Sequence, residues 1–198
     1  MTALFILVRH AQSTLNLVGR VNGDPGVQVE LSREGVEQAE LLRLQLAQLP
    51  IDLCIHTRFE RTRRTAAIAL AGRGVSFREE PLLDDIDIGL LEGRTTDEYR
   101  AWKRVHPRED PFPGGESLDA AAARYAQAFA ALASSSTSGA NAVLVVCHEI
   151  PLRYALNGAA GSGSLEGPVH DVPNATPFLF ATPAIARAAQ AIERMARA

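Results

Sequence analysis

ALFILVRHAQS, residues 3–13, is the stretch that decides the fold class of this chain. Its first six residues, 3–8, are all apolar and lack the alternation of a strand with one exposed face. Such a continuous run is typical of a central strand in a parallel sheet, which is covered on both faces. Arg9 and His10 follow at once. We therefore expect a cation and an imidazole at the carboxyl end of that strand.

Strand and helix patterns alternate along the rest of the chain. Besides 3–8, we expect strands at residues 51–56, 75–78, 142–146 and 177–181. Apolar residues at helical spacing predict helices at residues 33–49, 60–71, 97–104 and 118–132, from about 151 onward and at the C-terminus. This alternation predicts an α/β fold with a mostly parallel central sheet.

Length, charge and cysteine content limit the class of protein. The length favours a single domain over residues 1–198, with a Pro- and Gly-rich inserted loop and helix region at about 82–115 that could roof a site. The net charge of -3 gives no basic character, so we expect neither nucleic acid nor membrane as a partner.

Two cysteines and an N-terminal apolar run too short for a signal peptide predict a cytoplasmic protein with free thiols. We expect a monomer or a homodimer.

A second apolar strand also ends at a histidine. The sequence VLVVCH, residues 143–148, leads to His148 as ILVRH leads to His10. Ligands of α/β sheets bind beyond the carboxyl ends of the strands. Either histidine alone would more often be an ordinary loop residue, but the pair favours a shared site.

Arginines follow the second predicted strand in TRFERTRRTAAIA, residues 57–69. Most of this cluster fits a solvated helix face, but at least one arginine is expected at the same sheet edge. Two guanidiniums and two imidazoles suit a phosphate group, because arginine offers paired donors and stays charged. One neutral histidine could attack phosphorus, the other could stabilise the oxygens, and a carboxylic acid could protonate the leaving alkoxide.

Several motifs in order resemble those of the histidine phosphatase superfamily, in its phosphoglycerate mutase-like branch. LVRHAQSTLN resembles the RHG/RHA signature, and five further segments match family patterns: LSREGVEQA, RTRRTA, DIDIGLLEG, PGGES and VLVVCHEIPLR. The resemblance covers nearly the whole chain. It implies a three-layer α/β/α sandwich of the phosphoglycerate mutase type.

The resemblance also implies roles for individual residues. It makes His10 the nucleophile, Arg9 and Arg61 the phosphate clamps, and His148 the second pocket histidine. Asn16 stands at the matching position downstream of the signature and is a candidate to bind phosphate or substrate.

Three positions depart from the family pattern. Asp85 stands where the family usually has the glutamic acid that protonates the leaving group, and it is one methylene shorter. Glu149 replaces a glycine and would either face away from the anion site or recognise a cationic or hydroxylated substrate group. Arg58 stands where the family has a small or acidic residue and is a peripheral candidate for binding phosphate or substrate.

CHEIPLR, residues 147–153, offers a rival motif. It fits the C-x5-R spacing of cysteine-dependent phosphatases, in which a loop of backbone N–H groups binds phosphate. Pro151 lacks such an N–H, and no glycine eases the tight loop. We therefore expect Cys147 to be a buried strand residue.

These features predict a metal-independent phosphomonoesterase that forms a phosphohistidine intermediate on a small phosphorylated metabolite. No cofactor is expected, because the sequence has no Walker motif, dinucleotide-binding glycine motif or metal-spaced Cys and His set. One alternative is a phosphoglycerate mutase-type phosphotransferase, against which the modest chain length argues. The other is a phosphate-binding protein without turnover, suggested by Asp85 and Glu149.

Overall fold

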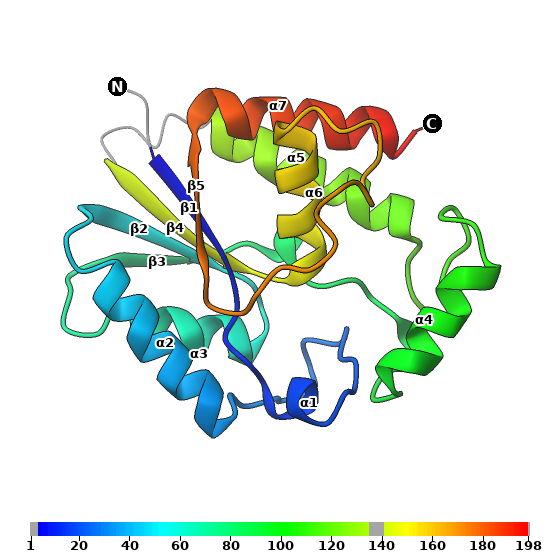
Figure 1. Cartoon of the computed structure of the whole chain (residues 1–198), viewed down its shortest axis with the longest axis horizontal. Helices are drawn as coiled ribbons and strands as arrows, with labels where there is room; N and C mark the ends of the chain where they lie inside the picture. Colours follow the sequence, from blue (N-terminus) through cyan, green and yellow to red (C-terminus); the bar gives the residue numbers. More distant parts are fainter. Residues whose placement is uncertain (1–3, 135–140, 198) are drawn as a thin grey trace.

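Five strands form one sheet in the order β3-β2-β4-β1-β5 (Figure 1). Their bounds are β1 (Leu4–Arg9), β2 (Ile51–His56), β3 (Ser76–Glu79), β4 (Ala142–Cys147) and β5 (Pro177–Ala181). The computed structural model describes residues 4–134 and 141–197. Ala3, at the start of the first predicted strand, lies outside the described residues.

Three of the four strand pairings are parallel, and β5 runs antiparallel to β1 at one edge of the sheet. The predicted α/β fold with a mostly parallel central sheet is therefore confirmed. β4 pairs on one side with β1 and on the other with β2, so the two most apolar strands lie side by side in the middle.

Helices cover both faces of the sheet. The helices are α1 (Thr14–Leu17), α2 (Arg33–Gln45), α3 (Glu60–Ala69), α4 (Thr96–Val105), α5 (Leu118–Ser134), α6 (Glu149–Ala159) and α7 (Thr182–Met195), with short 3-10 turns η1 (Pro81–Leu83) and η2 (Gly89–Leu91). In Figure 1, α2 and α3 lie on one side of the sheet, α5, α6 and α7 lie on the other, and α4 stands apart at the edge. The result is the expected three-layer arrangement.

Burial on both faces explains the unbroken apolar run of β1. Phe5 and Leu7 belong to the hydrophobic core beneath α5, α6 and α7. Ile6 and Val8 belong to the core beneath α2 and α3. Because successive strand residues point to opposite faces, both sets must be apolar when both faces are covered.

Several helix boundaries differ from the sequence-based expectation, most clearly those of α2 and α6. α2 ends at Gln45 instead of continuing to 49, and Val36 on this helix is 39% exposed. The buried face is centred on Gly35, where an added Cβ would meet the Gln12 carbonyl oxygen at 2.0 Å. α6 begins at Glu149, before Pro151, because proline is tolerated in the first turn of a helix.

The described part of the chain contains no helix that is both long and apolar enough to cross a membrane.

Candidate active site

The register of β1 and β4 places the two predicted histidines next to each other. Arg9 at the end of β1 pairs with Cys147 at the end of β4, so the residue after each is a histidine. The backbone N–H of His10 donates to the Cys147 carbonyl at 2.9 Å. The two imidazole ring centroids are 5.4 Å apart. Two strand ends 138 residues apart in sequence, at His10 and His148, thus form one site.

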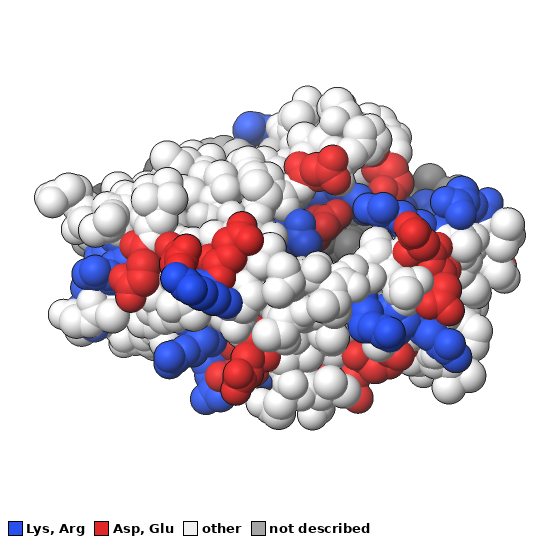
Figure 2. Space-filling view, turned by 60° about the horizontal axis from the view of Figure 1, so that its bottom comes forward, with Lys and Arg blue, Asp and Glu red and all other residues white. Residues whose placement is uncertain are grey.

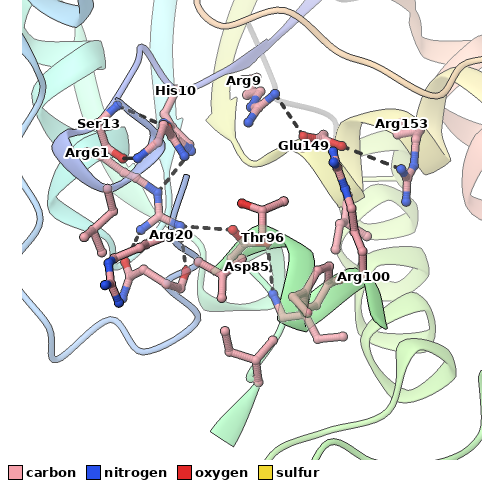
Figure 3. A pocket seen from close by; sticks show the side chains of 18 of the residues that line it. Arg9, His10, Ser13, Arg20, Arg61, Asp85, Thr96, Arg100, Glu149 and Arg153 are labelled. Atoms are coloured by element: carbon pink, nitrogen blue, oxygen red, sulfur yellow. Dashed lines mark hydrogen bonds and ion pairs between the residues drawn. The ribbon is translucent and has the colours of Figure 1, made fainter. Parts of the chain in front are cut away.

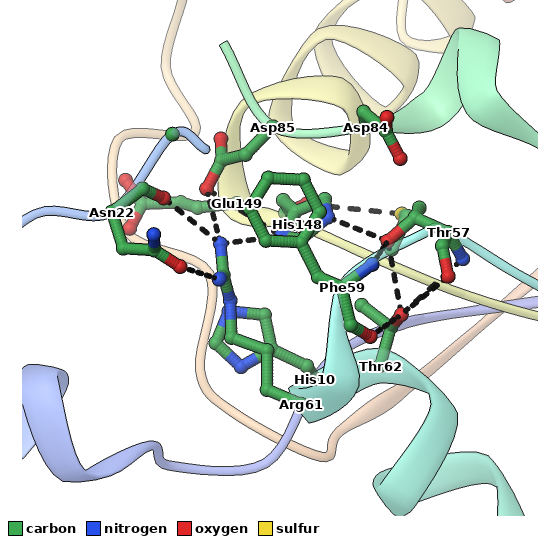
Figure 4. A network of polar contacts seen from close by, with 12 residues as sticks. His10, Asn22, Thr57, Phe59, Arg61, Thr62, Asp84, Asp85, His148 and Glu149 are labelled. Atoms are coloured by element: carbon green, nitrogen blue, oxygen red, sulfur yellow. Dashed lines mark hydrogen bonds and ion pairs between the residues drawn. The ribbon is translucent and has the colours of Figure 1, made fainter. Parts of the chain in front are cut away.

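Arg61 connects the groups of this site. It lies in the first turn of α3, its side chain is buried, and its Nε donates to Nε2 of His10 at 3.0 Å (Figure 4). Its Nη2 lies 3.1 Å from Nδ1 of His148 and 3.0 Å from Oδ2 of Asp85. The guanidinium carbon stands 4.2 Å above the ring centroid of Phe59. These contacts hold a fixed cation between both imidazoles and the carboxylate.

His10 is held in one tautomer. Its Nδ1 lies 2.8 Å from the Ala11 carbonyl oxygen, which can only accept a hydrogen bond, so Nδ1 is protonated. The lone pair of Nε2 then faces the Arg61 N–H. Burial and the neighbouring Arg61 and Arg9 charges lower the pKa of His10 well below its ordinary value. A neutral imidazole with an unprotonated nitrogen at the pocket is the form of histidine that can attack as a nucleophile, once a ligand replaces the Arg61 hydrogen bond.

A chain of hydroxyl groups orients His148 in a similar way. Thr62 Oγ1 donates to the Phe59 carbonyl at 2.8 Å and lies 2.9 Å from Thr57 Oγ1, which lies 2.9 Å from Nε2 of His148. Arg61 Nη2, which can only donate, lies 3.1 Å from Nδ1 of His148, so Nδ1 is the acceptor. Nε2 therefore carries the proton and donates it to Thr57 Oγ1. Burial, Arg61 and His10 lower the pKa of His148 well below its ordinary value.

Asp85 reaches His148 despite its short side chain. Its Oδ2 lies 3.4 Å from Nδ1 of His148, and Oδ1 accepts from the Ile86 N–H at 3.1 Å. Arg124 on α5 holds the loop by donating to the carbonyls of Leu82, Asp84 and Asp85 at 3.0, 2.7 and 2.9 Å. Burial raises the pKa of Asp85 above its ordinary value, and the Arg61 charge opposes part of this effect. A raised pKa suits a carboxyl group that must hold a proton before it donates it.

Arg9 and Glu149 form an ion pair at the pocket wall (Figure 3). Arg9 Nη1 lies 2.9 Å from Glu149 Oε2 and donates to the Val172 carbonyl at 2.7 Å. The other carboxylate oxygen of Glu149 lies 3.6 Å from Arg153 Nη1. Of the two sequence-based alternatives for Glu149, the structure excludes the one in which the side chain faces away.

Arg9, His10, Arg61, Asp85 and Glu149 line a pocket of about 350 Å³. His148, predicted as the second pocket histidine, is fully buried beside Arg61 and is not part of this lining. Six of its lining residues are basic: Arg9, Arg20, Arg61, Arg100, Lys103 and Arg153. Three are acidic: Asp85, Glu149 and Asp171. Figure 2 shows charges of both signs gathered around a hollow in one face of the molecule. An excess of cations around a concave site favours an anionic ligand.

The family of this chain follows from comparison with known proteins. The model of the histidine phosphatase superfamily (branch 1) matches residues 5–178. The chain belongs to the histidine phosphatase superfamily.

Relatives and solved structures agree with this assignment. Phosphoserine phosphatase 1 of Hydrogenobacter thermophilus is 33% identical over 159 residues, covering 75% of this chain and 72% of that protein. A 2,3-bisphosphoglycerate-dependent phosphoglycerate mutase of Methylobacterium radiotolerans is 29% identical over 196 residues, covering 91% of this chain and 90% of that protein. The crystal structure of the alpha-ribazole phosphatase from Shigella flexneri has the same fold, with a TM-score of 0.77 at 24% identity and coverage of 90% of this chain and 93% of that one.

Within this histidine phosphatase fold, Arg58 does not lie where the sequence predicted it. We expected Arg58 at the edge of the phosphate site, but its backbone N–H and side chain bind the Asp84 carboxylate at 2.9 and 2.5 Å. Both residues border a second hollow and do not line the pocket that contains His10. Asn16 does line that pocket, although its Oδ1 accepts from the Ser13 N–H at 3.1 Å.

Three residues that support the site were not predicted. Asn22 accepts from Arg61 through its side-chain and backbone oxygens, the latter at 3.2 Å. Its Nδ2 donates to Glu92 at 2.8 Å, and Thr57 orients His148 as described above. Glu92 belongs to the DIDIGLLEG segment, so the sequence contained a signal for it. Asn22 and Thr57 lie in loops without such a signal.

Cys147 does not take part in the site. It is fully buried at the end of β4, and burial raises the pKa of its thiol to about 12. A thiol is a nucleophile only as the thiolate, so Cys147 is poorly suited to attack phosphate near neutral pH. Arg153, the other end of the C-x5-R motif, is paired with Glu149 and Glu166.

Among the described residues, no three His, Cys, Asp or Glu side chains are placed to hold a metal ion.

Proposed function

We propose that this chain is a phosphomonoesterase that acts on a small phosphorylated metabolite through a phosphohistidine intermediate on His10. The observation that carries the proposal is the contact between Nε2 of neutral His10 and the buried Arg61 guanidinium at 3.0 Å. This contact puts a nucleophile and a phosphate-binding cation at one point of the pocket. The overlap of this chain with a relative named as a phosphoserine phosphatase supports it.

In the first half of the reaction, the phosphate dianion binds between Arg9 and Arg61 and replaces the Arg61–His10 hydrogen bond. Nε2 of His10 attacks phosphorus, so a P–N bond forms as the P–O ester bond breaks. Asp85 gives its proton to the leaving oxygen, and the alcohol departs. The raised pKa of Asp85 supports this role, because the carboxyl group must be protonated at the start.

In the second half, water attacks the phosphohistidine. The P–N bond breaks, a new P–O bond forms, and the Asp85 carboxylate takes the proton of the water. Nδ1 of His148 lies 3.1 Å from Nη2 of the same Arg61 guanidinium. A bound dianion favours the protonated form of His148, which would donate a hydrogen bond to a phosphate oxygen.

A mutase is the second enzymatic candidate. The comparisons include a relative named as a phosphoglycerate mutase, of which this chain covers 90%, so chain length does not separate the two activities. The same pocket could return the phosphoryl group to a substrate hydroxyl instead of water. No feature of the pocket favours this transfer over hydrolysis.

The test is to incubate the protein with p-nitrophenyl phosphate and a panel of phosphorylated metabolites, with and without EDTA. We expect release of inorganic phosphate that EDTA does not reduce. Transfer to a second substrate hydroxyl in preference to water would favour the mutase. Tight phosphate binding with no release at any pH between about 4 and 8 would favour a binding protein without turnover.

A further inference from the structure

Glu149 places a carboxylate beside the arginine that binds phosphate in the proposed function. It is the first residue of α6 and directly follows His148. Its Oε2 lies 2.9 Å from Arg9 Nη1, and a third of its side chain, 33%, is exposed. It lines the same pocket as His10 and Asp85. A ligand that reaches Arg9 must therefore meet the Glu149 carboxylate as well.

One donor of the Arg9 guanidinium group has no partner in the described part of the chain. Its Nε is buried and has no hydrogen-bond partner among the described residues, whereas Nη1 is shared between Glu149 and the Val172 carbonyl. A buried N–H without a partner is costly, so an acceptor is expected there. A phosphate oxygen bound by this guanidinium would stand close to the Glu149 carboxylate, 2.9 Å from Nη1, and two anions would then share one cation.

Three cations farther along the wall, Arg108, Lys103 and Arg153, are already paired with carboxylates. Arg153 lies 2.9 Å from Glu166 and 3.6 Å from Glu149. Arg108 also contacts Glu166, at 3.0 Å, and Asp119 at 2.9 Å. Lys103 lies 3.9 Å from Glu166. These three cations face three carboxylates, Glu149, Glu166 and Asp119, so the paired group has no surplus positive charge for a second anion beside Glu149. Arg100 also lines the pocket and makes no ion pair among the described residues, so it remains as a cation that could meet such an anion.

We infer that Glu149 is a charge-selecting residue of the pocket. It competes with the phosphate dianion for Arg9, and it penalises substrates that bear a second anionic group within the first few atoms beyond the ester oxygen. The inference rests on the proposed function, because that function makes Arg9 a phosphate ligand. Because Glu149 competes for Arg9, the pocket should bind the product phosphate more weakly. It should also prefer substrates whose leaving group is neutral or cationic near the ester oxygen.

The substitution Glu149→Gln removes the charge and leaves the surrounding cations in place. Arg9 keeps its bond to the Val172 carbonyl, and Arg153 keeps Glu166. Glu149→Ala is a second variant, which removes the carboxylate without putting the carboxamide of glutamine in its place. Glu193→Gln, on the exposed end of α7, is the matched control for the loss of one negative charge.

The assay uses three substrates with the same two-carbon leaving group: phosphoethanolamine, 2-hydroxyethyl phosphate and 2-phosphoglycolate. They end in an ammonium, a hydroxyl and a carboxylate. We expect Glu149→Gln to raise the ratio of kcat/KM for phosphoglycolate over phosphoethanolamine about tenfold, with hydroxyethyl phosphate in between. The inhibition constant of inorganic phosphate against p-nitrophenyl phosphate should fall by a similar factor, and Glu193→Gln should change neither.

A uniform change for all three substrates, or a phosphate inhibition constant that stays the same or rises, would overturn the inference and make Glu149 a structural support for Arg9. If the protein hydrolyses none of these esters, the proposed function fails. Calorimetric titration with inorganic phosphate then still tests Glu149, since tighter binding to Glu149→Gln supports the competition and unchanged binding refutes it.

Discussion

Nε of Arg61 donates a hydrogen bond to Nε2 of His10 over 3.0 Å. The two residues are 51 positions apart, one at the start of α3 and the other just after β1. Because Nδ1 of His10 is committed to the Ala11 carbonyl, this contact shows which nitrogen is available to react. The same guanidinium holds His148 and Asp85, so one side chain aligns the groups that the proposed reaction needs.

His10→Ala should lower turnover at least about 10³-fold, because no other group can take the phosphoryl moiety. When turnover of the wild-type protein is quenched rapidly without acid, the protein should carry a covalently bound phosphoryl group. Acid should then release this group, as it does from a phosphoramidate. Cys147→Ala is the matched control and should keep activity, because the Cys147 thiol is buried and its pKa is raised to about 12. Activity that survives in His10→Ala and disappears on thiol alkylation would reassign the nucleophile to cysteine.

Asp85→Asn should affect substrates according to their leaving groups. Alkyl phosphates need a proton on the departing oxygen, so their kcat should fall about 10²- to 10³-fold, whereas p-nitrophenyl phosphate should lose far less. Asp84→Asn is a suitable control, since Asp84 binds Arg58 and borders the other hollow. An equal loss for both kinds of ester would show that Asp85 acts by holding Arg61 and not as an acid.

Glu92→Gln tests the support of Arg61. The Glu92 carboxylate accepts from Asn22 Nδ2 at 2.8 Å and from the backbone N–H groups of Gly23 and Asp24 at 2.7 and 3.1 Å. A glutamine turns one acceptor into a donor and leaves an N–H without a partner. We expect kcat/KM to fall about tenfold through misplacement of Asn22 and Arg61. The exposed Glu37→Gln on α2 should leave kcat/KM unchanged, and a similar result for Glu92→Gln would refute the positioning role.

The free energy of unfolding should fall as the pH is lowered from about 7.5 to 5.5. Burial lowers the pKa of His10 and of His148 in the folded protein, so below about pH 6.5 the unfolded chain binds more protons at these positions. The raised pKa values of Asp84 and Asp85 act in the opposite direction. However, the ordinary pKa of an aspartic acid lies well below this pH range, whereas that of histidine lies within it.

His10→Gln should reduce this pH dependence by up to about 1.4 kcal/mol per pH unit, the value for one proton. The measurement is urea denaturation at several pH values in phosphate-free buffer, since phosphate would bind the folded state. An unchanged slope in His10→Gln would mean that this imidazole titrates normally in the folded protein.

The sequence located the main site residues because the strand ends are local features. An apolar run followed by Arg9 and His10, and another followed by His148, predicts the same sheet edge whenever the strands are parallel. The parallel register of β1 and β4 then puts the two histidines side by side. Asp85 was found by motif position, and the held loop brings it within reach of His148.

Arg58 shows why position along the chain was insufficient. Like Arg61, it belongs to the arginine cluster that follows the second strand, from which at least one side chain was expected at the sheet edge. However, α3 begins at Glu60, with Phe59 as its N-cap, so Arg58 lies before the helix and its direction follows the loop. The Asp84 carboxylate then fixes it in the second hollow.

The sequence by itself determined the α/β fold, the two strand ends that present histidines and the superfamily motifs, because these depend on patterns within a few consecutive residues. Only the tertiary structure decided that Asn22 and Thr57 support the site, that Arg58 faces another hollow and that Glu149 binds Arg9. Those contacts join residues from different loops and helices, and their geometry depends on how the elements pack against the sheet. A side chain's neighbours in space are not encoded by its neighbours in the chain.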